Sequence, residues 1–477
     1  MQKTQTAESN NINYKKISTY YMVGTLFNQG TSFLTVPIFT RLLTTTDYGV
    51  VTTYNSWVSI ISMIVSCALQ MGVRAAFIDY KKTINDVMAT VTTFTLLNGL
   101  ILTGIFSVIA AVFHVSYPEI LILICMIHSI GFALLQNYSM YLMMQYRYKP
   151  RTALMVLPNF IAVFASLVVI IFFLKKDLYL GRIIPTALSQ AVFGASTLFL
   201  VYKNSRDLFD KKYLKYTLAI SLPLVLHGIA LNILSQSDRL MITWLRNASE
   251  TGIYSLIYNF SMIATVITTS LDGVWVPWFT ANLKNKEIRA INNRSRDYIE
   301  IMTVAMIGLI LVGPEIVKLL ADKRYWEGIS IIPPIVLANY AIFAYTLYVN
   351  IEHFHKKTIY ITFNTLIAAG INIVTNYIFI PKFGYMAAAY TTLFSYVVAL
   401  FLHASYAKKM EKDLYPIRYF IVPILKIIIA VFAFYLFMNS FWIRWILAAL
   451  FVLIEALTHK NLVDYVFPFI KNIISRN

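Results

Sequence analysis

Short polar stretches divide the chain into about fourteen apolar segments, and this layout constrains the fold more than any motif. A helix of about 20 apolar residues spans a hydrocarbon core of roughly 30 Å, and most of the segments reach that length. With 58% hydrophobic and 13% charged residues, the chain cannot bury its apolar surface in a soluble core. We therefore predict an all-α polytopic membrane protein, because helices satisfy their own backbone hydrogen bonds in lipid.

The predicted spans are 17–40, 50–72, 87–113, 120–144, 153–174, 183–202, 217–240, 253–277, 298–320, 329–351, 358–380, 385–406, 419–438 and 441–458. The last span is the weakest, since Arg444 and Glu455 lie near its ends. No hydrophilic stretch between spans is long enough to form a soluble domain. Trp275, Trp278 and the Trp442/Trp445 pair are expected at membrane interfaces.

The distribution of Lys and Arg predicts the orientation. Of the 40 basic residues, 28 fall in the tails and connectors on one side and 11 on the other. The positive-inside rule then places both termini in the cytoplasm. The net charge of +18 is mostly this topology signal, and no basic domain with interleaved aromatics suggests nucleic acid as a partner.

Composition and motifs exclude several classes of chemistry. Cys67 and Cys125 both lie inside apolar segments, so they offer neither a disulfide framework nor a metal-ligand pair. We find no phosphate-cradling glycine loop, nucleophile elbow or clustered metal ligands. We therefore expect no enzymatic activity, no cofactor and no metal, and an ATP-driven pump is disfavoured. The N-terminus shows no cleavable signal peptide.

Weak self-similarity indicates an internal repeat. Asn28 and Asn232 begin similar segments at an offset of 204 residues, and Tyr54-Asn55 meets Tyr258-Asn259 at the same offset. Six helices per repeat is an even number, so both repeats would enter the membrane from the cytoplasm, related by an axis along the membrane normal. We expect a cleft between two such bundles and alternating access by rocking them.

The predicted organisation is a cytoplasmic tail (1–16), an N-lobe of helices one to six (17–202), a cytoplasmic connector (203–216), a C-lobe of helices seven to twelve (217–406), an added helix pair (419–458) and a cytoplasmic amphipathic tail (459–477).

Four sets of segments carry recognisable motifs: Pro37-Ile-Phe-Thr-Arg41 with Asp47-Tyr-Gly49, Ser237-Asp238-Arg239 with Glu250-Thr-Gly252-Ile-Tyr254, Trp275-Val-Pro277, and Asn376 through Thr391. They resemble the polysaccharide flippases, the oligosaccharide-lipid branch of the multidrug, oligosaccharidyl-lipid and polysaccharide exporter superfamily. The resemblance covers nearly the whole chain.

The resemblance implies a flippase that moves undecaprenyl-pyrophosphate-linked oligosaccharide repeat units from the inner to the outer leaflet. Such transport serves the biosynthesis of O-antigen, capsule or related polysaccharides in the bacterial cytoplasmic (inner) membrane. The implied partners are the lipid-linked oligosaccharide, membrane lipids, and a polysaccharide polymerase and glycosyltransferases.

Such a cargo needs a cationic path, because a bare pyrophosphate is very costly in hydrocarbon and guanidinium groups bind phosphate oxygens bidentately. The cations in or beside spans are Arg41, Arg74, Arg239 and Lys426. For the three arginines the alternative is snorkelling to the interface or an ion pair within the fold, and for Lys426 it is snorkelling.

Acidic groups in spans could couple ions to transport, and Asp272 and Asp238 are the candidates. For Asp238, pairing with a neighbouring Arg is the alternative. Polar side chains expected to line the cleft are Asn28, Gln29, Asn232 and Gln236, with helix–helix hydrogen bonding as the other interpretation.

Two other functions remain open. The first is a cation-coupled exporter of drugs or small molecules. Twelve spans and a carboxylate in the first helix would favour this function, whereas the predicted span 17–40 has neither Asp nor Glu. The second is a flippase for a peptidoglycan precursor. The sequence does not distinguish this function from the flipping of lipid-linked oligosaccharide repeat units.

Overall fold

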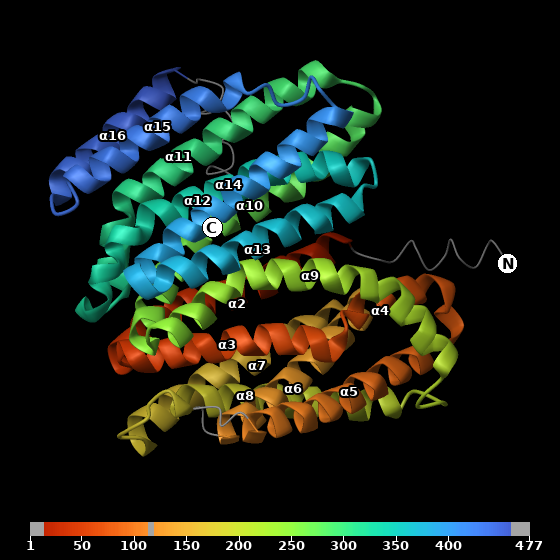
Figure 1. Cartoon of the computed structure of the whole chain (residues 1–477). Coiled ribbons are helices and arrows are strands. Elements are labelled where there is room, and N and C mark those ends of the chain that lie inside the picture. The colour runs from red at the N-terminus through yellow and green to blue at the C-terminus, as the bar shows by residue number, and fades with distance from the viewer. Residues whose placement is uncertain (1–13, 113–118, 459–477) are drawn as a thin grey trace. The chain divides into compact units, whose positions relative to one another are not determined.

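The computed structural model describes residues 14–112 and 119–458, which form helices and no strand (Figure 1). The elements are α2 (Tyr14–Leu42), α3 (Thr45–Ser66), α4 (Leu69–Asp79), η1 (Lys81–Thr83), α5 (Ile84–Val112), α6 (Glu119–Met144), α7 (Tyr148–Val168), η2 (Val169–Phe173), α8 (Leu180–Tyr202), α9 (Lys211–Leu245), α10 (Ala248–Lys284), α11 (Ile288–Leu320), η3 (Lys323–Ile331), α12 (Ile332–Phe354), α13 (Thr358–Phe383), α14 (Tyr385–Met410), α15 (Arg418–Leu436) and α16 (Phe441–Thr458). The predicted all-α class is confirmed.

Every predicted span overlaps helix in the described residues, and eleven helical segments there are long and apolar enough to cross a membrane. These eleven do not include α2, α9 or α16. The number of fourteen spans therefore stays a prediction. Most of the predicted tail at 1–16, and all of the tail at 459–477, lie outside the described residues.

The second predicted span, 50–72, was wrong as one continuous helix. The chain breaks between α3 and α4 at Cys67 and Ala68, whose φ angles are 45° and 48°. A break inside a span frees backbone carbonyls, which need partners in hydrocarbon. The Asn98 side chain supplies them, because its Nδ2 donates to the carbonyls of Ile64 (3.1 Å) and Val65 (3.0 Å).

The chain divides into two compact units, Met1–Ile233 and Leu234–Asn477, here called unit 1 and unit 2. The division falls inside α9, after the predicted connector at 203–216. α9 begins at Lys211, so the last residues of that connector are helical.

In unit 1, α6 packs against α3, α5 and α8, and α7 packs against α2 and α8. The closest approach of α6 and α8 lies at two glycines: a Cβ added to Gly131 would lie 2.5 Å from the carbonyl oxygen of Gln190, and one added to Gly194 would lie 2.6 Å from the Cα of Gly131. Small residues allow two membrane helices to approach this closely.

In unit 2, α12 packs against α10, α11 and α14, and α13 packs against α14. Trp275 is 2% exposed, and its ring stacks on Tyr298 at 4.9 Å between centroids. Its predicted place at a membrane interface was wrong, because this face of α10 packs against protein rather than lipid headgroups. Trp442 is exposed, and its place at a membrane interface stays a prediction.

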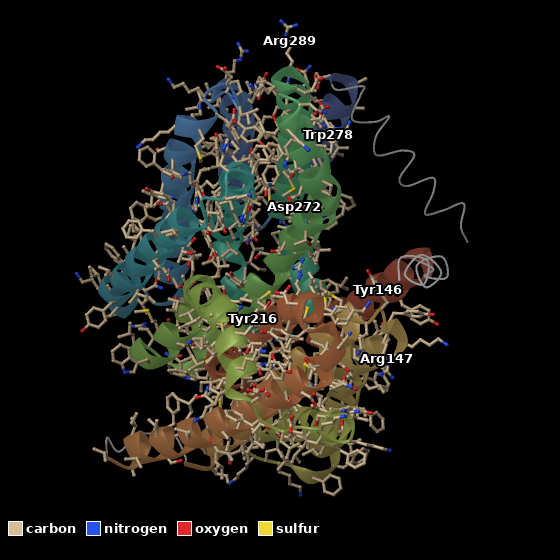
Figure 2. All side chains as sticks on the ribbon, turned by 90° about the vertical axis from the view of Figure 1, so that its right-hand side faces the viewer. Tyr146, Arg147, Tyr216, Asp272, Trp278 and Arg289 are labelled. Carbon is tan, nitrogen blue, oxygen red and sulfur yellow. The ribbon has the colours of Figure 1, made fainter. Side chains whose placement is uncertain are left out.

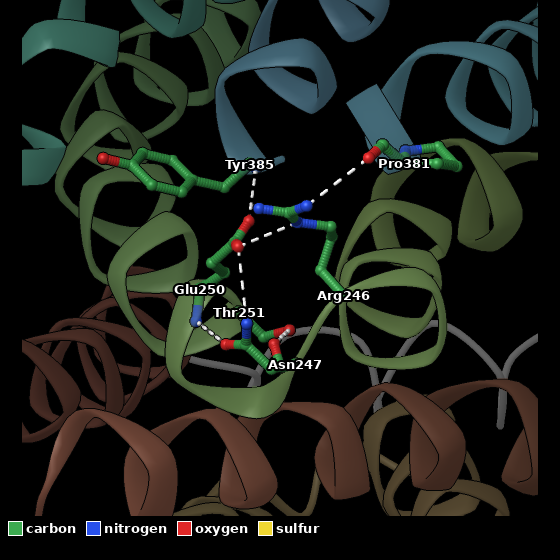
Figure 3. A network of polar contacts seen from close by, with 6 residues as sticks. All are labelled: Arg246, Asn247, Glu250, Thr251, Pro381 and Tyr385. Atoms are coloured by element: carbon green, nitrogen blue, oxygen red, sulfur yellow. Dashed lines mark hydrogen bonds and ion pairs between the residues drawn. The ribbon is translucent and has the colours of Figure 1, made fainter. Parts of the chain in front are cut away.

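In each unit, an acidic side chain in the first turn of one helix accepts a hydrogen bond from the backbone N–H at or just before the start of another helix. In unit 1 the Asp47 carboxylate caps the start of α3 and accepts a hydrogen bond from the backbone N–H of Tyr179, just before α8 (3.2 Å). In unit 2 Glu250, in the first turn of α10, accepts one from the N–H of Tyr385 at the start of α14 (3.0 Å; Figure 3). This correspondence supports the repeat inferred from sequence.

The added pair α15 and α16 lies beside α11 in unit 2 (Figure 1). Two groups of charged side chains connect α15 and α16 to α11. The ammonium of Lys426 on α15 lies 3.1 Å from Glu300 on α11 and 2.6 Å from Glu455 on α16. The Arg444 guanidinium on α16 pairs with Glu315 on α11 and donates to the carbonyl of Leu311 (3.3 Å). Ion pairs as well as apolar packing therefore hold the helices α15 and α16 against α11.

We predict that Gly131→Val destabilises unit 1 by about 1–3 kcal/mol, because the added side chain overlaps the α8 backbone. The measurement is the thermal unfolding midpoint of the purified protein in detergent. Gly104→Val on α5 is the matched control, since nothing lies within 4 Å of a Cβ added there. Equal midpoints for the two variants would contradict the proposed close contact.

We predict that Lys426→Met lowers the free energy of unfolding by about 3–5 kcal/mol, because Glu300 and Glu455 lose the ammonium between them. The exposed Lys409→Met serves as the control. Adding Glu300→Gln and Glu455→Gln should restore much of the loss. A Lys426→Met protein as stable as its parent would show that the three charges do not hold the helix pair.

Candidate functional site

A buried polar cluster surrounds Asp238 in unit 2. Asp238 Oδ1 accepts a hydrogen bond from Asn376 Nδ2 on α13 (2.7 Å), and Oδ2 accepts from Thr392 Oγ1 on α14 (2.6 Å). The hydroxyl of Tyr254 on α10 also donates to Oδ2. Four helices therefore converge on one carboxylate, which is 1% exposed.

A second layer of amides and hydroxyls supports this carboxylate. Asn372 Oδ1 accepts from Ser237 Oγ (2.8 Å) and from Asn376 Nδ2 (3.1 Å), and Thr391 donates to Asn376 Oδ1. Polar side chains on apolar helices need partners inside the bundle, which explains why they gather here. The cluster is rich in oxygen atoms, the ligands that hard cations prefer.

Asp238 makes no ion pair within the described residues, so its three hydrogen bonds come from neutral donors. The sequence alternative, in which Asp238 pairs with a neighbouring Arg, is therefore not what the structure contains. Its two oxygens are therefore surrounded by neutral hydrogen-bond donors rather than by a cationic side chain in this part of the chain.

The guanidinium of Arg239 points to a different set of residues from the carboxylate of Asp238. Nη1 donates to the Ser235 carbonyl (3.1 Å) and to Gln236 Oε1 (2.7 Å), and Nη2 donates to Asn259 Oδ1 (3.3 Å). The guanidinium also lies over the Tyr258 ring, 4.6 Å from its centroid. No carboxylate pairs with it in the part of the chain that the structure describes, although the residue is only 6% exposed.

The predicted cleft-lining residues have separate surroundings. Gln236 orients Arg239, as described above. Asn232 lies in unit 1, where its Oδ1 accepts from Ser59 Oγ (2.6 Å) and its Nδ2 donates to the Gly228 carbonyl (3.1 Å). Asn28 and Gln29 lie on α2, and their side chains fall outside the described residues.

The predicted cations of unit 1 lie at helix surfaces. Arg41, in the last turn of α2, is exposed and donates to the Pro37 carbonyl (3.0 Å). Arg74 is exposed on α4.

Lys426 and Asp272 complete the predicted set. Lys426 lies between two carboxylates, as described for α15, so its charge is already balanced. Asp272 is half-buried on α10, and Figure 2 shows it with Trp278 and Arg289 beyond it toward one end of unit 2. It interacts electrostatically with Tyr298. It lies outside the Asp238 cluster.

Sequence reasoning missed Arg182 in unit 1. We placed it in a connector before the span at 183–202, but it lies in the first turn of α8. Its guanidinium stands over the Phe39 ring at 4.2 Å and donates to Ser166 Oγ (3.4 Å), with no carboxylate partner among the described residues. A span boundary three residues earlier would have identified it as a membrane cation.

Residues 15–283, more than half of the chain, match the family model described as polysaccharide biosynthesis protein. Lsg locus putative protein 1 of Haemophilus influenzae is 24% identical over 285 residues, which cover 57% of this chain and 67% of the relative. An uncharacterized membrane protein of the same species is 22% identical over 399 residues, covering 77% and 92%.

Solved structures share the fold. The inward closed conformation of lipid II flippase MurJ has a TM-score of 0.69 at 14% identity, covering 94% of this chain and 99% of that one. An inward-facing multidrug resistance MATE transporter of the MOP superfamily has a TM-score of 0.56 at 14% identity, covering 81% and 94%. The resemblance drawn from the sequence motifs is thereby confirmed. The chain belongs to the polysaccharide biosynthesis protein family, and it is a multi-pass membrane protein with the fold of the flippases and transporters of the MOP superfamily.

Proposed function

We propose that the protein flips undecaprenyl-pyrophosphate-linked oligosaccharide repeat units from the inner to the outer leaflet by alternating access, without catalysing a reaction. The observation that carries this proposal is the family match over residues 15–283. In this proposal the protein acts in the bacterial cytoplasmic membrane with both termini in the cytoplasm. The pathway is that of O-antigen, capsule or a related polymer, alongside a polymerase and glycosyltransferases.

The charge environment of Arg239 supports a pyrophosphate cargo. A guanidinium has five N–H donors. Three of those of Arg239 are used by neutral acceptors, which leaves two for an anion. Its positive charge has no carboxylate partner in the described residues, so an incoming phosphate would not first have to break an ion pair. We propose Arg239 as a cargo contact, with Arg41 and Arg74 as further contacts in unit 1.

The balanced charge of Lys426 removes the reason for proposing it as a cargo contact, since an anion would have to compete with Glu300 and Glu455. Asp238 and Asp272 remain our proposed positions for ion coupling. The oxygen-rich shell of Asp238 supports that role for a hard cation.

A cation-coupled exporter is the second candidate function, and one observation favours it: a transporter of the MATE family shares the fold. Against it, α2 contains neither Asp nor Glu. A peptidoglycan-precursor flippase is the third candidate, supported by the fold shared with a lipid II flippase. Transport assays in proteoliposomes that offer the lipid-linked oligosaccharide, the peptidoglycan precursor or a small-molecule drug separate the three.

We predict that Arg239→Ala reduces export of lipid-linked oligosaccharide at least tenfold, because a bidentate phosphate contact is lost. Arg239→Lys should recover only part of it, since an ammonium cannot form the planar fork. Arg41→Ala and Arg74→Ala should also reduce export. The measure is surface polysaccharide normalised to the amount of inserted protein, with the exposed Arg289→Ala as control. Full export by all three Ala variants would remove these arginines as cargo contacts.

We also predict that an inside-negative membrane potential accelerates flipping, because outward movement of an anion gains about 2.3 kcal/mol per charge per 100 mV. Proteoliposomes with a potassium diffusion potential, with and without valinomycin, measure this effect. Equal rates with the potential present and collapsed would contradict it and favour coupling to a proton or sodium gradient.

A further inference from the structure

Glu352 and His403 form a pair of titratable side chains inside unit 2, away from the Asp238 cluster. His403 Nδ1 on α14 lies 2.8 Å from Glu352 Oε2 on α12. The side chains are 1% and 0% exposed, respectively. Glu352 lies near the C-terminus of α12, and Lys356 and Lys357 follow it, so the positive-inside prediction places the pair toward the cytoplasm.

Two atoms of this pair have no hydrogen-bond partner among residues 14–112 and 119–458. These atoms are Glu352 Oε1 and His403 Nε2, and both are buried. An unsatisfied buried polar atom costs about 1–3 kcal/mol. Either arrangement of the shared proton leaves both atoms unsatisfied, so water reaching the site would recover this cost.

Without water around it, the Glu352–His403 pair is expected to hold one titratable proton, because its net charge is then zero. With one titratable proton the pair is either imidazolium with carboxylate or imidazole with carboxylic acid, and its net charge is zero. Without that proton the net charge is −1, which is very unfavourable in a dry interior. In a hydrated site this penalty is smaller, so the pair can release its proton to water.

The neighbouring titratable groups do not balance such a negative charge permanently. His353 on α12 and Tyr406 on α14 interact electrostatically with Glu352, and the Tyr345 ring stacks on His403 at 5.5 Å. In the described part of the chain, no hydrogen bond or ion pair joins a charged side chain of α10, α11 or α13 to the pair. The proton is thus the group that neutralises Glu352.

A continuous row of side chains leads from this pair to Arg239. Tyr345 stacks on Tyr396 with centroids 6.3 Å apart, and Tyr396 shares a hydrogen bond with Tyr258. Tyr258 lies under the Arg239 guanidinium. All of these residues belong to unit 2.

We propose that Glu352 and His403 form a proton-binding site, which holds one titratable proton in the dry arrangement and releases it to water when the cytoplasmic end of α12 and α14 becomes hydrated. The row through Tyr345, Tyr396 and Tyr258 links the site to Arg239. This link to transport rests on the proposed function, whereas the proton site itself does not.

Infrared difference spectroscopy of the full chain in nanodiscs, between about pH 6 and about pH 9, tests the site without any cargo. The wild type should show a pH-dependent carboxyl and imidazole signal that Glu352→Gln and His403→Gln both remove. The double variant Glu411→Gln with His355→Gln is the matched control, because that His–Glu pair lies at the same helix ends but is partly exposed (2.9 Å; 32% and 24%).

A signal that persists in both single variants would overturn the proton site. If a single variant does not fold, the exchange variant Glu352→His with His403→Glu keeps both groups and should keep the signal. Its absence in a folded exchange variant would also overturn the proposal, since the same two groups would then not share a proton.

Flipping by proteoliposomes of the undecaprenyl-linked cargo tests the link to transport. The wild-type rate should change at least tenfold across the same pH range, and the Glu352→Gln rate less than twofold. A pH-independent wild-type rate would overturn the coupling. Failure of the proposed function would instead abolish flipping at every pH while leaving the infrared signal in place.

Discussion

The absence of water in the hydrocarbon core is the constraint on which the rest of this structure depends. Every polar group placed there must find a partner inside the protein. Asn98 satisfies the two carbonyls freed where α3 and α4 separate. The Asp238 carboxylate collects donors from three other helices. The Lys426 and Arg444 groups connect α15 and α16 to α11. Polar residues therefore mark the helix contacts of this fold.

Because polar groups in the hydrocarbon core need partners, the groups whose partners are incomplete are candidates for function. Within the described residues, Arg239 has neutral partners only, and the Glu352–His403 pair leaves two buried atoms without hydrogen bonds. Such groups cost stability, so a fold retains them where a ligand or a proton completes their surroundings. For a carrier of an anionic lipid-linked cargo, an uncompensated guanidinium provides attraction for phosphate without an ion pair to break. A neutralisable carboxylate provides a charge that changes with hydration.

The helices could be predicted from sequence to within several residues because span length and hydropathy are local properties. Pairing could not. Lys426 was a free cation in the sequence view, since Glu300 lies 126 residues away along the chain and on another helix. Trp275 had the composition of an interfacial residue, but its neighbours Tyr298 and Tyr415 come from distant segments. Arg182 was missed because a boundary error of three residues moved it out of the membrane.

The central claim is that the protein carries a lipid-linked oligosaccharide between leaflets. The most direct measurement reconstitutes the purified chain in vesicles whose inner leaflet holds fluorescent undecaprenyl-pyrophosphate oligosaccharide, with an impermeant glycosidase outside. Our account predicts that the protected cargo becomes accessible over time with the wild-type protein and far more slowly with Arg239→Ala. Cargo that stays protected at the rate of protein-free vesicles, under every imposed ion gradient and potential, would contradict it.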